Sequence, residues 1–547
     1  MENQKTAGSN SLDMTKFMSN IQAWTLQAPE AINTDLIRAF METHDFAWIG
    51  MSALAICLIL ILLCWGNAEE KYPFGQTYMK FAPRWFSGYR WATSARDVMR
   101  KAHGAFKDQA YRIIRHDVNL IMLPPSAVDE VAAFPNELAS NLHALEFDLA
   151  SHFTGLGHLR DAHLHARFVH RKITPNLARL AAGIEQEVDR AIEELLDAPA
   201  DGWREVTIYP ILTQLSSRVS ARIMLGKDYA TDKKWLLIAQ KFTENFLGTV
   251  MIMRSCPNFM LPILKWALPT SWATTKHIRE AQKHLGPEFS RLLALSENSN
   301  WKPSDEEEKW GVEWLVHLAE DKERTPESLV HAEILLILAS IPTTVFSEIN
   351  VLLDIISHDG LIDQVREEIE KVATEEEWSF KSYGKLHKLD SILRESQRLA
   401  PPTMIGLRRI MERQHTLADG TVLPKNSYIC VPTYTIQNDP NNTPNPQEYD
   451  GLRSYRKRLA EHGQVQTTRH QFVTTESTVL GFGHGRTACP GRYLASAALK
   501  IIVSKLLMAY DIRLPDGQVT RPPNGIAHEF LSAPADTKIL LRKRSRR

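Results

Sequence analysis

The chain has 547 residues, of which 44% are hydrophobic and 23% are charged, a composition typical of a globular protein with a large buried core. Lysine plus arginine and aspartate plus glutamate number 64 each, so the chain lacks the basic excess that favours nucleic-acid binding. The cysteines are few, odd in number and without a CxxC pair, which argues against a disulfide framework or a zinc ribbon and favours a reducing compartment. They are Cys57, Cys64, Cys256, Cys430 and Cys489.

The N-terminal part of the chain contains a candidate membrane span. Residues 46–66, FAWIGMSALAICLILILLCWG, carry no charge, are long enough to cross a bilayer, and have Trp48 and Trp65 near their ends as interfacial anchors. A cleaved signal is a poorer match because 45 residues precede the apolar run. A buried core helix is the other alternative. We predict a short tail in residues 1–45, a transmembrane helix in 46–66 and one large domain in 67–547.

The distribution of basic residues predicts the orientation of this span. Seven basic residues follow it closely and three precede it, and the side richer in lysine and arginine is expected to be cytosolic. The tail is then lumenal, the large domain is cytosolic, and the endoplasmic reticulum is the expected membrane. The residues that follow are Lys71, Lys80, Arg84, Arg90, Arg96, Arg100 and Lys101, and those that precede are Lys5, Lys16 and Arg38.

The middle of the large domain is rich in helical patterns. Apolar residues recur at helical spacing in 163–195, 235–246, 275–295 and 325–357. The last of these begins with Thr325 as a helix N-cap followed by proline, and its apolar run includes a histidine and a glutamate. We therefore expect it to be a buried core helix and not a second membrane span.

Strand-like patterns appear only after about residue 400. One is GLRRIMERQHTLADGTVLP, residues 406–424, with a turn at Asp419 and Gly420, and another is SYICVP, residues 427–432. The predicted fold class is therefore mainly α with small β-sheets, in a single large domain.

The stretch VLGFGHGRTACPGRYLAS, residues 479–496, contains the most informative cysteine. Cys489 precedes a helical pattern, with Pro490 suited to the first helical position, so unpaired N–H groups and the helix dipole would stabilise a thiolate there. The glycines before it allow tight turns and close approach of the backbone to a flat ligand, beside which Phe482 can pack. An axial thiolate to haem iron is a function that this loop fits.

The ordered residues from Phe482 through Gly485, Arg486 and Cys489 to Gly491 resemble the haem-binding signature of the cytochrome P-450 superfamily, the haem-thiolate monooxygenases. The form GFGHGRTACPGRYLAS is especially similar to membrane-anchored fungal members that act in secondary metabolism. The alternative is a buried structural cysteine. The resemblance implies the cytochrome P-450 fold, haem b with Cys489 as the axial ligand of its iron, and O₂ as a substrate.

Three further stretches extend the resemblance over roughly residues 71–547. The first is ESQR, residues 395–398, where Glu395 and Arg398 share one helical face. The same pattern occurs at Glu187 and Arg190, and its ordinary meaning is a solvated ion pair. The resemblance instead implies a buried structural triad of Glu395, Arg398 and Arg453, which supports folding around haem.

The second stretch contains Arg408 and Arg409 in a strand-like segment, where the family has a base that pairs with a haem propionate. Arg486 is another candidate for this contact, and surface arginines are the alternative. Thr487 stands where the family more often has arginine or histidine, which weakens one expected propionate contact.

The third stretch is ASIPTT, residues 339–344, which aligns with the family's oxygen-activation segment. The resemblance implies that Thr343, with Thr344 beside it, guides protons in catalysis; a threonine bonded to the preceding helical turn is the alternative. Pro342 stands where the family often has an acid, which puts the usual acid-plus-threonine relay in doubt. Since proline removes a backbone N–H, we also expect a kink there.

The resemblance implies oxidation of a lipophilic small molecule, by hydroxylation or successive oxidation, in fungal terpenoid, meroterpenoid or alkaloid biosynthesis. The chain has no flavin or dinucleotide motif, so electrons must come from a separate NADPH-dependent reductase. Arg492, Lys500 and Lys505 either form part of its docking face or are a solvated helical face. Candidate substrate contacts, which core packing explains equally well, are Leu335, Leu338, Ala339, Thr403, Met404 and Ile405.

Two other functions fit the same residues. A haem-thiolate enzyme that desaturates or rearranges its substrate without net oxygen insertion is favoured by the absence of an acid at Pro342. A non-catalytic, membrane-anchored haem-binding scaffold would retain its function without Cys489.

Overall fold

A computed structural model describes residues 72–76, 84–157, 163–298, 300–304, 310–375, 377–462 and 468–544. All of these belong to one compact unit, Asn67–Arg547. The predicted tail and transmembrane helix, residues 1–66, lie outside the described residues. The division into tail, span and catalytic domain therefore stays a prediction.

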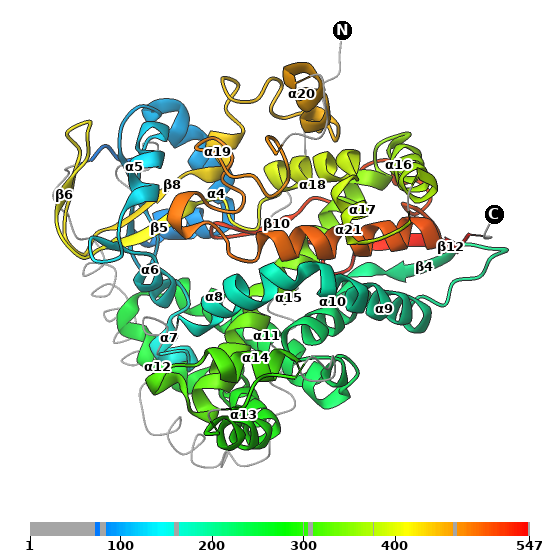
Figure 1. Cartoon of the computed structure of the whole chain (residues 1–547). Coiled ribbons are helices and arrows are strands. Elements are labelled where there is room, and N and C mark those ends of the chain that lie inside the picture. Colours follow the sequence, from blue (N-terminus) through cyan, green and yellow to red (C-terminus); the bar gives the residue numbers. More distant parts are fainter. Residues whose placement is uncertain are drawn as a thin grey trace, which may run out of the picture. The chain divides into compact units, whose positions relative to one another are not determined.

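The described part is mainly helical, as predicted (Figure 1). Its helices are α4 (Arg84–Phe106), α5 (Val128–Ala133), α6 (Asn141–Asp148), α7 (Ser151–Thr154), α8 (Leu164–Phe168), α9 (Leu177–Leu195), α10 (Ile208–Met224), α11 (Lys233–Arg254), α12 (Leu261–Ala267), α13 (Pro269–Ser296), α14 (Trp310–Leu318), α15 (Pro326–Ile356), α16 (Leu361–Glu375), α17 (Phe380–Gly384), α18 (His387–Leu399), α19 (Thr433–Gln437), α20 (Arg453–His462) and α21 (Arg492–Ala509).

The strands form small sheets. The largest has the order β1-β2-β8-β5-β3, β12 lies between β4 and β9, and β6-β7 and β10-β11 are hairpins. The strands are β1 (Tyr111–Ile114), β2 (Asn119–Met122), β3 (Ala139–Ser140), β4 (Arg204–Thr207), β5 (Gly406–Met411), β6 (His415–Thr416), β7 (Val422–Leu423), β8 (Tyr428–Val431), β9 (Tyr510–Arg513), β10 (Gly525–Ala527), β11 (Phe530–Ser532) and β12 (Lys538–Lys543).

The prediction that strands begin only after about residue 400 was wrong, because β1 to β4 precede that point. β1 and β2 are four residues each, too short for alternation to identify them, and β2 is held by parallel pairing with β8, about 300 residues later in the chain. β5 to β8 lie in the two predicted stretches, and the predicted turn joins β6 and β7, where Gly420 has φ +85°. β9 to β12 were not predicted.

α15 is the central helix of the core. Its N-cap is Thr325, whose side chain accepts a hydrogen bond from the Ser328 N–H at 3.2 Å, as predicted. The helix packs against α10, α11, α13 and α21, around which the largest core cluster forms (Figure 1). Among the described helices only α15 is long and apolar enough to span a membrane, and most of its apolar stretch is buried, which confirms the prediction of a core helix. The expected kink at Pro342 does not interrupt the helix.

The predicted helix over 163–195 is not continuous. α8 ends at Phe168, a π-helical turn spans Val169–Ile173, and a short 3₁₀ turn at Thr174–Asn176 precedes α9. Pro175 explains part of this break, since proline has no backbone N–H to donate to the preceding turn. The other predicted helices lie within α11, α13 and α15.

Candidate active site

The segment before Cys489 folds into a compact loop stabilised by backbone hydrogen bonds. Gly483 and Gly485 have φ of +72° and +64°, left-handed values that favour glycine over residues with a Cβ. The Cys489 N–H donates to the Phe482 carbonyl at 2.7 Å, which closes the loop. The tight backbone predicted from the glycines is therefore formed, and Cys489 lies one short turn before α21.

α21 begins at Arg492, with Gly491 as its N-cap, so Pro490 lies before the helix and not at its first position as predicted. Pro490 and Gly491 form a turn between the cysteine and the helix, and the carbonyl of Cys489 accepts from the Arg492 guanidinium at 2.8 Å. Burial raises the pKa of the Cys489 thiol, while hydrogen bonds from the backbone N–H groups of Gly491 and Arg492 and the Arg492 charge oppose that rise. Donors suited to a thiolate therefore face the sulfur.

Two contacts hold the loop against the rest of the domain. The Phe482 ring packs edge-on against Phe472, with ring centroids 4.9 Å apart. A Cβ on Gly485 would lie 2.8 Å from the Cβ of Ala132 in α5, so only glycine fits this close approach. Arg486, in the short 3₁₀ turn Gly485–Thr487, is exposed.

Of the two candidate arginines on β5, the structure brings only Arg409 to the Cys489 loop. Arg409 is fully buried, and its Nη2 donates to Thr487 Oγ1 at 3.1 Å. Its Nε and Nη1 have no hydrogen-bond partner, and burial lowers its pKa to about 10. A buried cation with two unsatisfied donors is costly unless an anion joins it.

Arg408 faces a different group of side chains. Its Nη1 lies 2.8 Å from Asp148 Oδ2, and Tyr428 donates to the same oxygen at 2.7 Å. Of the two arginines expected to contact a haem propionate, only Arg409 therefore stays a candidate. Adjacent residues of a strand point to opposite faces, so both side chains do not reach one ligand.

Arg408 belongs to a buried cluster of balanced charge, which we call the ion cluster. Its members are Arg115, Arg254, Arg408, Asp117, Asp148 and Glu529. Arg115 contacts all three carboxylates, with distances of 2.5 Å to Asp117, 3.0 Å to Asp148 and 3.2 Å to Glu529. Burial opposes ionisation of Asp148 and Glu529, but the nearby arginines outweigh it and lower the pKa of both carboxyls.

The predicted proton-guiding residues lie in the middle of α15. Thr343 Oγ1 donates to the Ala339 carbonyl at 2.7 Å, the geometry of the alternative in which the hydroxyl bonds the preceding turn. Ala339 and Thr343 are nevertheless exposed, although most of this helix is buried. Residues four apart share one helical face, so Ala339 and Thr343 mark an exposed part of this face of α15.

The predicted triad residues meet in one buried arrangement. Arg398 makes a two-pronged contact with Glu395, at 2.6 and 2.9 Å. Arg453 Nε approaches the same carboxylate at 3.2 Å and its Nη1 donates to the Pro444 carbonyl at 2.7 Å. These contacts connect α18, α20 and the loop between α19 and α20.

The candidate substrate contacts belong to two groups. Leu335 and Leu338 are part of the main core cluster, and Met404 and Ile405 are fully buried in a second one. Thr403 is half-buried and its Oγ1 donates to the Ile405 carbonyl at 3.1 Å. Ala339 is exposed, whereas the leucines, Met404 and Ile405 belong to core clusters. The six positions are therefore compatible with substrate contact and with core packing.

The prediction that Lys500 lies on an exposed face of α21, either for docking of a reductase or in contact with solvent, was wrong. This residue is buried, and its Nζ lies 2.8 Å from Asp390 and 3.2 Å from the Tyr383 carbonyl. Lys505 pairs with Asp189 at 2.7 Å. Helical spacing places a lysine on a face but does not reveal an acidic partner on another helix.

The sequence did not reveal two contacts of this site, that of Thr487 with Arg409 and that of Phe472 with Phe482. Thr487 was interpreted as a lost propionate contact, whereas its hydroxyl holds Arg409; Phe472 supports Phe482. Neither partner has a sequence signal, because both pairs join segments that meet only in the folded chain. The position of Thr487 two residues before Cys489 drew attention to this residue, but it did not reveal that Arg409 is its partner.

The residues present fit a haem. Within the described residues, no group of three or more histidine, cysteine, aspartate or glutamate side chains is arranged to hold a metal ion. Haem iron takes its other ligands from the porphyrin, so one cysteine is a sufficient ligand from the chain. Arg409, with two unsatisfied buried donors beside the same loop, suits a carboxylate of that cofactor.

Comparison with known proteins agrees with this site. Residues 96–541 match the family model described as cytochrome P450. Cytochrome P450 monooxygenase AN1598 of Emericella nidulans is 32% identical over 90% of this chain and 92% of its own length. Ent-kaurene oxidase of Gibberella intermedia is 27% identical over 93% of this chain and 94% of its own.

A solved structure has the same fold. The retinoic acid-bound cyanobacterial CYP120A1 superposes with a TM-score of 0.63 at 17% identity, and the match covers 87% of this chain and 100% of that one. At this identity the likeness shows the fold alone. The mainly helical architecture with small sheets is thus the one that this solved structure shares.

Proposed function

The chain belongs to the cytochrome P450 family, and on this premise we propose that Cys489 binds the haem iron with which it oxidises an apolar small molecule. The enzyme is a cytochrome P450 monooxygenase, and the family uses haem-thiolate iron, O₂ and electrons from a reductase. When bound, the haem activates O₂, and its thiolate ligand favours O–O cleavage. The roles of individual residues are our assignments.

In this proposal Cys489 would supply the thiolate that binds the haem iron. Its sulfur accepts hydrogen bonds from the N–H groups of Gly491 and Arg492, which stabilise negative charge on a thiolate. Phe482, fixed by Phe472, supports one side of the loop, and Gly485 lets it lie close against α5. Gly491 ends the loop as the N-cap of α21.

The observation that carries the assignment is the buried guanidinium of Arg409 beside this loop. With Nη2 held by Thr487, its unsatisfied Nε and Nη1 are left for a propionate, which accepts charge-assisted hydrogen bonds. Arg408 is engaged by Asp148 and Arg486 is exposed, so neither is the principal propionate residue in this proposal.

We assign proton handling to Thr343 Oγ1, on the exposed face of α15 with Thr344 next to it. The hydroxyl donates to the Ala339 carbonyl, and its oxygen can accept a hydrogen bond from water at the same time. Pro342 contributes no acid, so Thr343 acts without the carboxylate that the family often has at that position. Glu395, Arg398 and Arg453 have a structural role and take no part in the chemistry.

The proposed substrate is a lipophilic carbon skeleton from fungal secondary metabolism, with a terpenoid preferred over an alkaloid. The relatives include an ent-kaurene oxidase, whose name identifies a hydrocarbon substrate. Leu335, Leu338, Ala339, Thr403, Met404 and Ile405 are the proposed contacts, all apolar except Thr403. A desaturase or rearrangement reaction is the second candidate, favoured by the absence of an acid at Pro342.

The partner proposed for electron supply is a membrane-bound reductase that uses NADPH. Residues 46–66 would anchor the chain in the endoplasmic reticulum, with the catalytic domain in the cytosol, so that enzyme, reductase and lipophilic substrate share one membrane. The uncharged apolar sequence of this segment supports the anchor.

Replacing Cys489 tests the proposal. In the reduced, carbon monoxide-bound protein, we expect Cys489→Ala to lose the Soret band characteristic of thiolate ligation and the host to accumulate the substrate. A precursor lighter than the product by one oxygen atom supports monooxygenation, and one heavier by two hydrogens supports desaturation. An unchanged spectrum and metabolite profile would refute catalysis through Cys489.

A further inference from the structure

Asp390 on α18 is a buried carboxylate that contacts three separate segments of the chain. Its Oδ1 lies 2.8 Å from the Lys500 Nζ on α21, and its Oδ2 contacts the Arg458 guanidinium on α20. The same Oδ2 accepts a hydrogen bond from the backbone N–H of Phe472 at 2.9 Å. Burial opposes ionisation of this carboxyl, but Lys500 and Arg458 outweigh it and lower its pKa. Asp390 is therefore a charged group at the point where these segments meet.

One of these contacts leads to the segment before Cys489. Phe472 is 2% exposed, and its ring packs edge-on against Phe482, with ring centroids 4.9 Å apart. The Phe482 carbonyl in turn accepts the Cys489 N–H at 2.7 Å. Asp390 thus fixes the backbone of the residue whose ring supports the start of the Cys489 loop.

The residues just before Phe472 are held by hydrogen bonds from α18 and α20. The Arg458 guanidinium donates to the His470 carbonyl at 2.8 Å, and Arg394 on α18 donates to the Gln471 carbonyl at 2.7 Å. His470 has φ +58°, a left-handed value that residues with a Cβ rarely adopt. A backbone in this conformation persists only where its surroundings fix it, so α18 and α20 set the position of Phe472.

Another contact of Asp390 leads to the helix after Cys489. Lys500 on α21 is 6% exposed, and its Nζ also donates to the Tyr383 carbonyl at 3.2 Å. A buried ammonium needs a nearby negative charge, and Asp390 supplies it. The first residue of α21 is Arg492, whose backbone N–H donates to the Cys489 sulfur. A shift of α21 would therefore move a donor to the sulfur.

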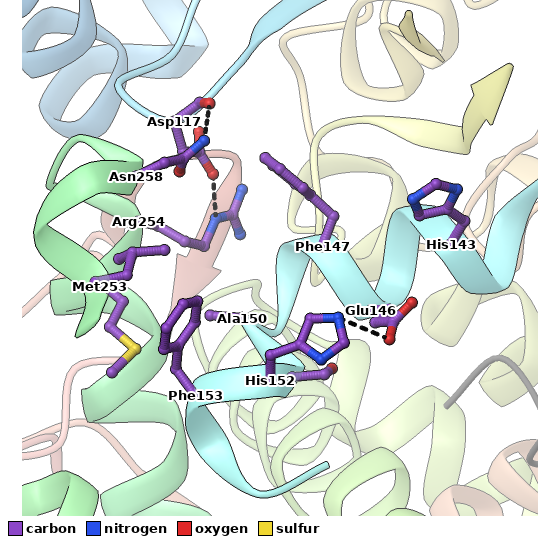
Figure 2. A pocket seen from close by; sticks show the side chains of 12 residues that line it. Asp117, His143, Glu146, Phe147, Ala150, His152, Phe153, Met253, Arg254 and Asn258 are labelled. Carbon is purple, nitrogen blue, oxygen red and sulfur yellow. Dashed lines mark hydrogen bonds and ion pairs between the residues drawn. The ribbon is translucent and has the colours of Figure 1, made fainter. Parts of the chain in front are cut away.

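The ion cluster provides a contrast within the same chain. Figure 2 shows Arg254 on α11 facing Asp117, with its Nε 4.0 Å from Asp117 Oδ2. Arg115 contacts the other oxygen of this carboxylate at 2.5 Å. The side chains of Asp117 and Asp390 are both 5% exposed. These arginines connect Asp117 to α11 and to the turn between β1 and β2, whereas Asp390 connects to the two sides of the Cys489 loop.

We propose that Asp390 is a positioning residue for the haem ligand, an inference that rests on the proposed role of Cys489. Through Phe472 it fixes the start of the Cys489 loop, and through Lys500 it fixes the helix that follows. One carboxylate thereby holds the sulfur in the position from which it would bind iron, and it keeps the N–H donors of α21 directed to a thiolate. Asp390 takes no part in the oxidation itself.

The test uses the purified full-length chain with haem, reduced and bound to carbon monoxide. The Soret band characteristic of thiolate ligation is followed over time at constant temperature, and far-ultraviolet circular dichroism follows the helix content in parallel. We expect Asp390→Asn to lose this band about ten- to hundredfold faster than the original chain while its helix content persists, because residues that orient a metal ligand have effects of this size. Asp117→Asn is the matched control and should lose the band only together with its helix content.

Two further variants test the proposal even if Asp390→Asn does not fold. Lys500→Met and Phe472→Leu each remove one of the two connections and leave Asp390 paired with Arg458. Each should accelerate loss of the band by a smaller factor, about two- to tenfold. An unchanged rate in either variant, or loss of the band in step with helix content in Asp390→Asn, would overturn the proposal. A chain in which Cys489 does not bind iron would lack the thiolate band before any substitution, so failure of the ligand assignment is recognised separately.

Discussion

Arg408 and Arg409 are neighbours on β5, yet they lie in opposite electrostatic environments. Arg408 joins the ion cluster, where three arginines meet three carboxylates and Tyr428 donates to Asp148. Arg409 is fully buried with one hydrogen bond, to Thr487, and two unsatisfied nitrogens. The comparison teaches that compensated buried charge stabilises the fold, whereas uncompensated buried charge beside a reactive loop indicates a bound anion.

The backbone of β5 separates the two arginines. Its pairing with β8 shifts register between Gly406 and Arg409, and Leu407 has φ +48°, so the strand is irregular just before the pair. Alternation along the strand then directs one guanidinium to α6 and the other to the Cys489 loop. A sequence of two adjacent arginines does not reveal which one reaches which side.

Breaking the ion cluster should give the largest effect. Asp148→Asn removes the carboxylate that faces Arg115 and Arg408, and it leaves the three arginines of the ion cluster with only Asp117 and Glu529 to compensate them. We expect a loss of about 3–5 kcal/mol in the free energy of unfolding, measured by urea denaturation. A loss below about 1 kcal/mol would show that the cluster behaves like an exposed ion pair.

Replacing Arg409 should lower haem affinity without lowering the stability of the haem-free protein. Arg409→Met eliminates an uncompensated buried charge, so the haem-free protein should be at least as stable as the original chain. Its haem affinity should fall about ten- to hundredfold, the equivalent of a charge-assisted hydrogen bond, as measured by haem titration. Arg486→Met is the matched control, since Arg486 is exposed in the same loop and should change affinity little. Equal effects of the two variants would contradict the assignment.

In the described part of the chain, Glu348 is a buried carboxyl without a neighbouring cation, in contrast to the carboxylates of the ion cluster. It should therefore make the stability of the protein depend on pH. Glu348 on α15 is fully buried, accepts from Ser216 Oγ at 2.9 Å, and has a pKa raised by burial from 4.5 to about 8. Because the folded state binds this proton more tightly, its contribution to stability is complete below about pH 4.5 and is lost as pH rises toward 8.

Between about pH 4.5 and 8, the original chain should lose up to about 1.4 kcal/mol of its free energy of unfolding per pH unit because of Glu348. We expect Glu348→Gln to abolish this pH-dependent loss. The measurement is the free energy of unfolding of both proteins at several pH values. Glu333, also buried and with a raised pKa, contributes in the same direction and is present in both proteins. Parallel pH curves for the original and variant chains would show that Glu348 does not titrate in this range.

The smallest expected effect concerns the hydroxyl that holds Arg409. Thr487→Val should weaken haem binding by about 0.5–1.5 kcal/mol, the contribution of one hydrogen bond. The same change in an Arg409→Met background should have almost no effect, because its partner is gone. An undiminished effect in that background would show that Thr487 acts independently of Arg409.

Local patterns predicted the elements whose signals lie close together in the chain. Thr325 and Pro326 marked the start of α15, and Asp419 and Gly420 marked the turn between β6 and β7. β1 and β2 were missed because short strands carry little alternation and depend on a distant partner. The π-helical turn before α9 also has no local signature beyond Pro175.

The candidate site also has features that local sequence predicts and features that depend on distant contacts. The spacing around Cys489 predicted a tight glycine loop before a helix, because the backbone conformation of glycine and the start of an amphipathic helix are local properties. The choice of Arg409 over Arg408, the burial of Lys500 and the contact of Thr487 with Arg409 join separate segments, and no single segment encodes them.

The sequence by itself determined the family and the helical character, and it marked Cys489 as the proposed haem ligand and residues 46–66 as a candidate membrane segment. Each of these signals depends on the order of nearby residues. Only the tertiary structure decided which buried charges are compensated. Among the described residues, Arg409 lacks a carboxylate, whereas Arg408 pairs with Asp148. Charge compensation depends on distances between segments that are far apart in the chain, and folding alone sets these distances.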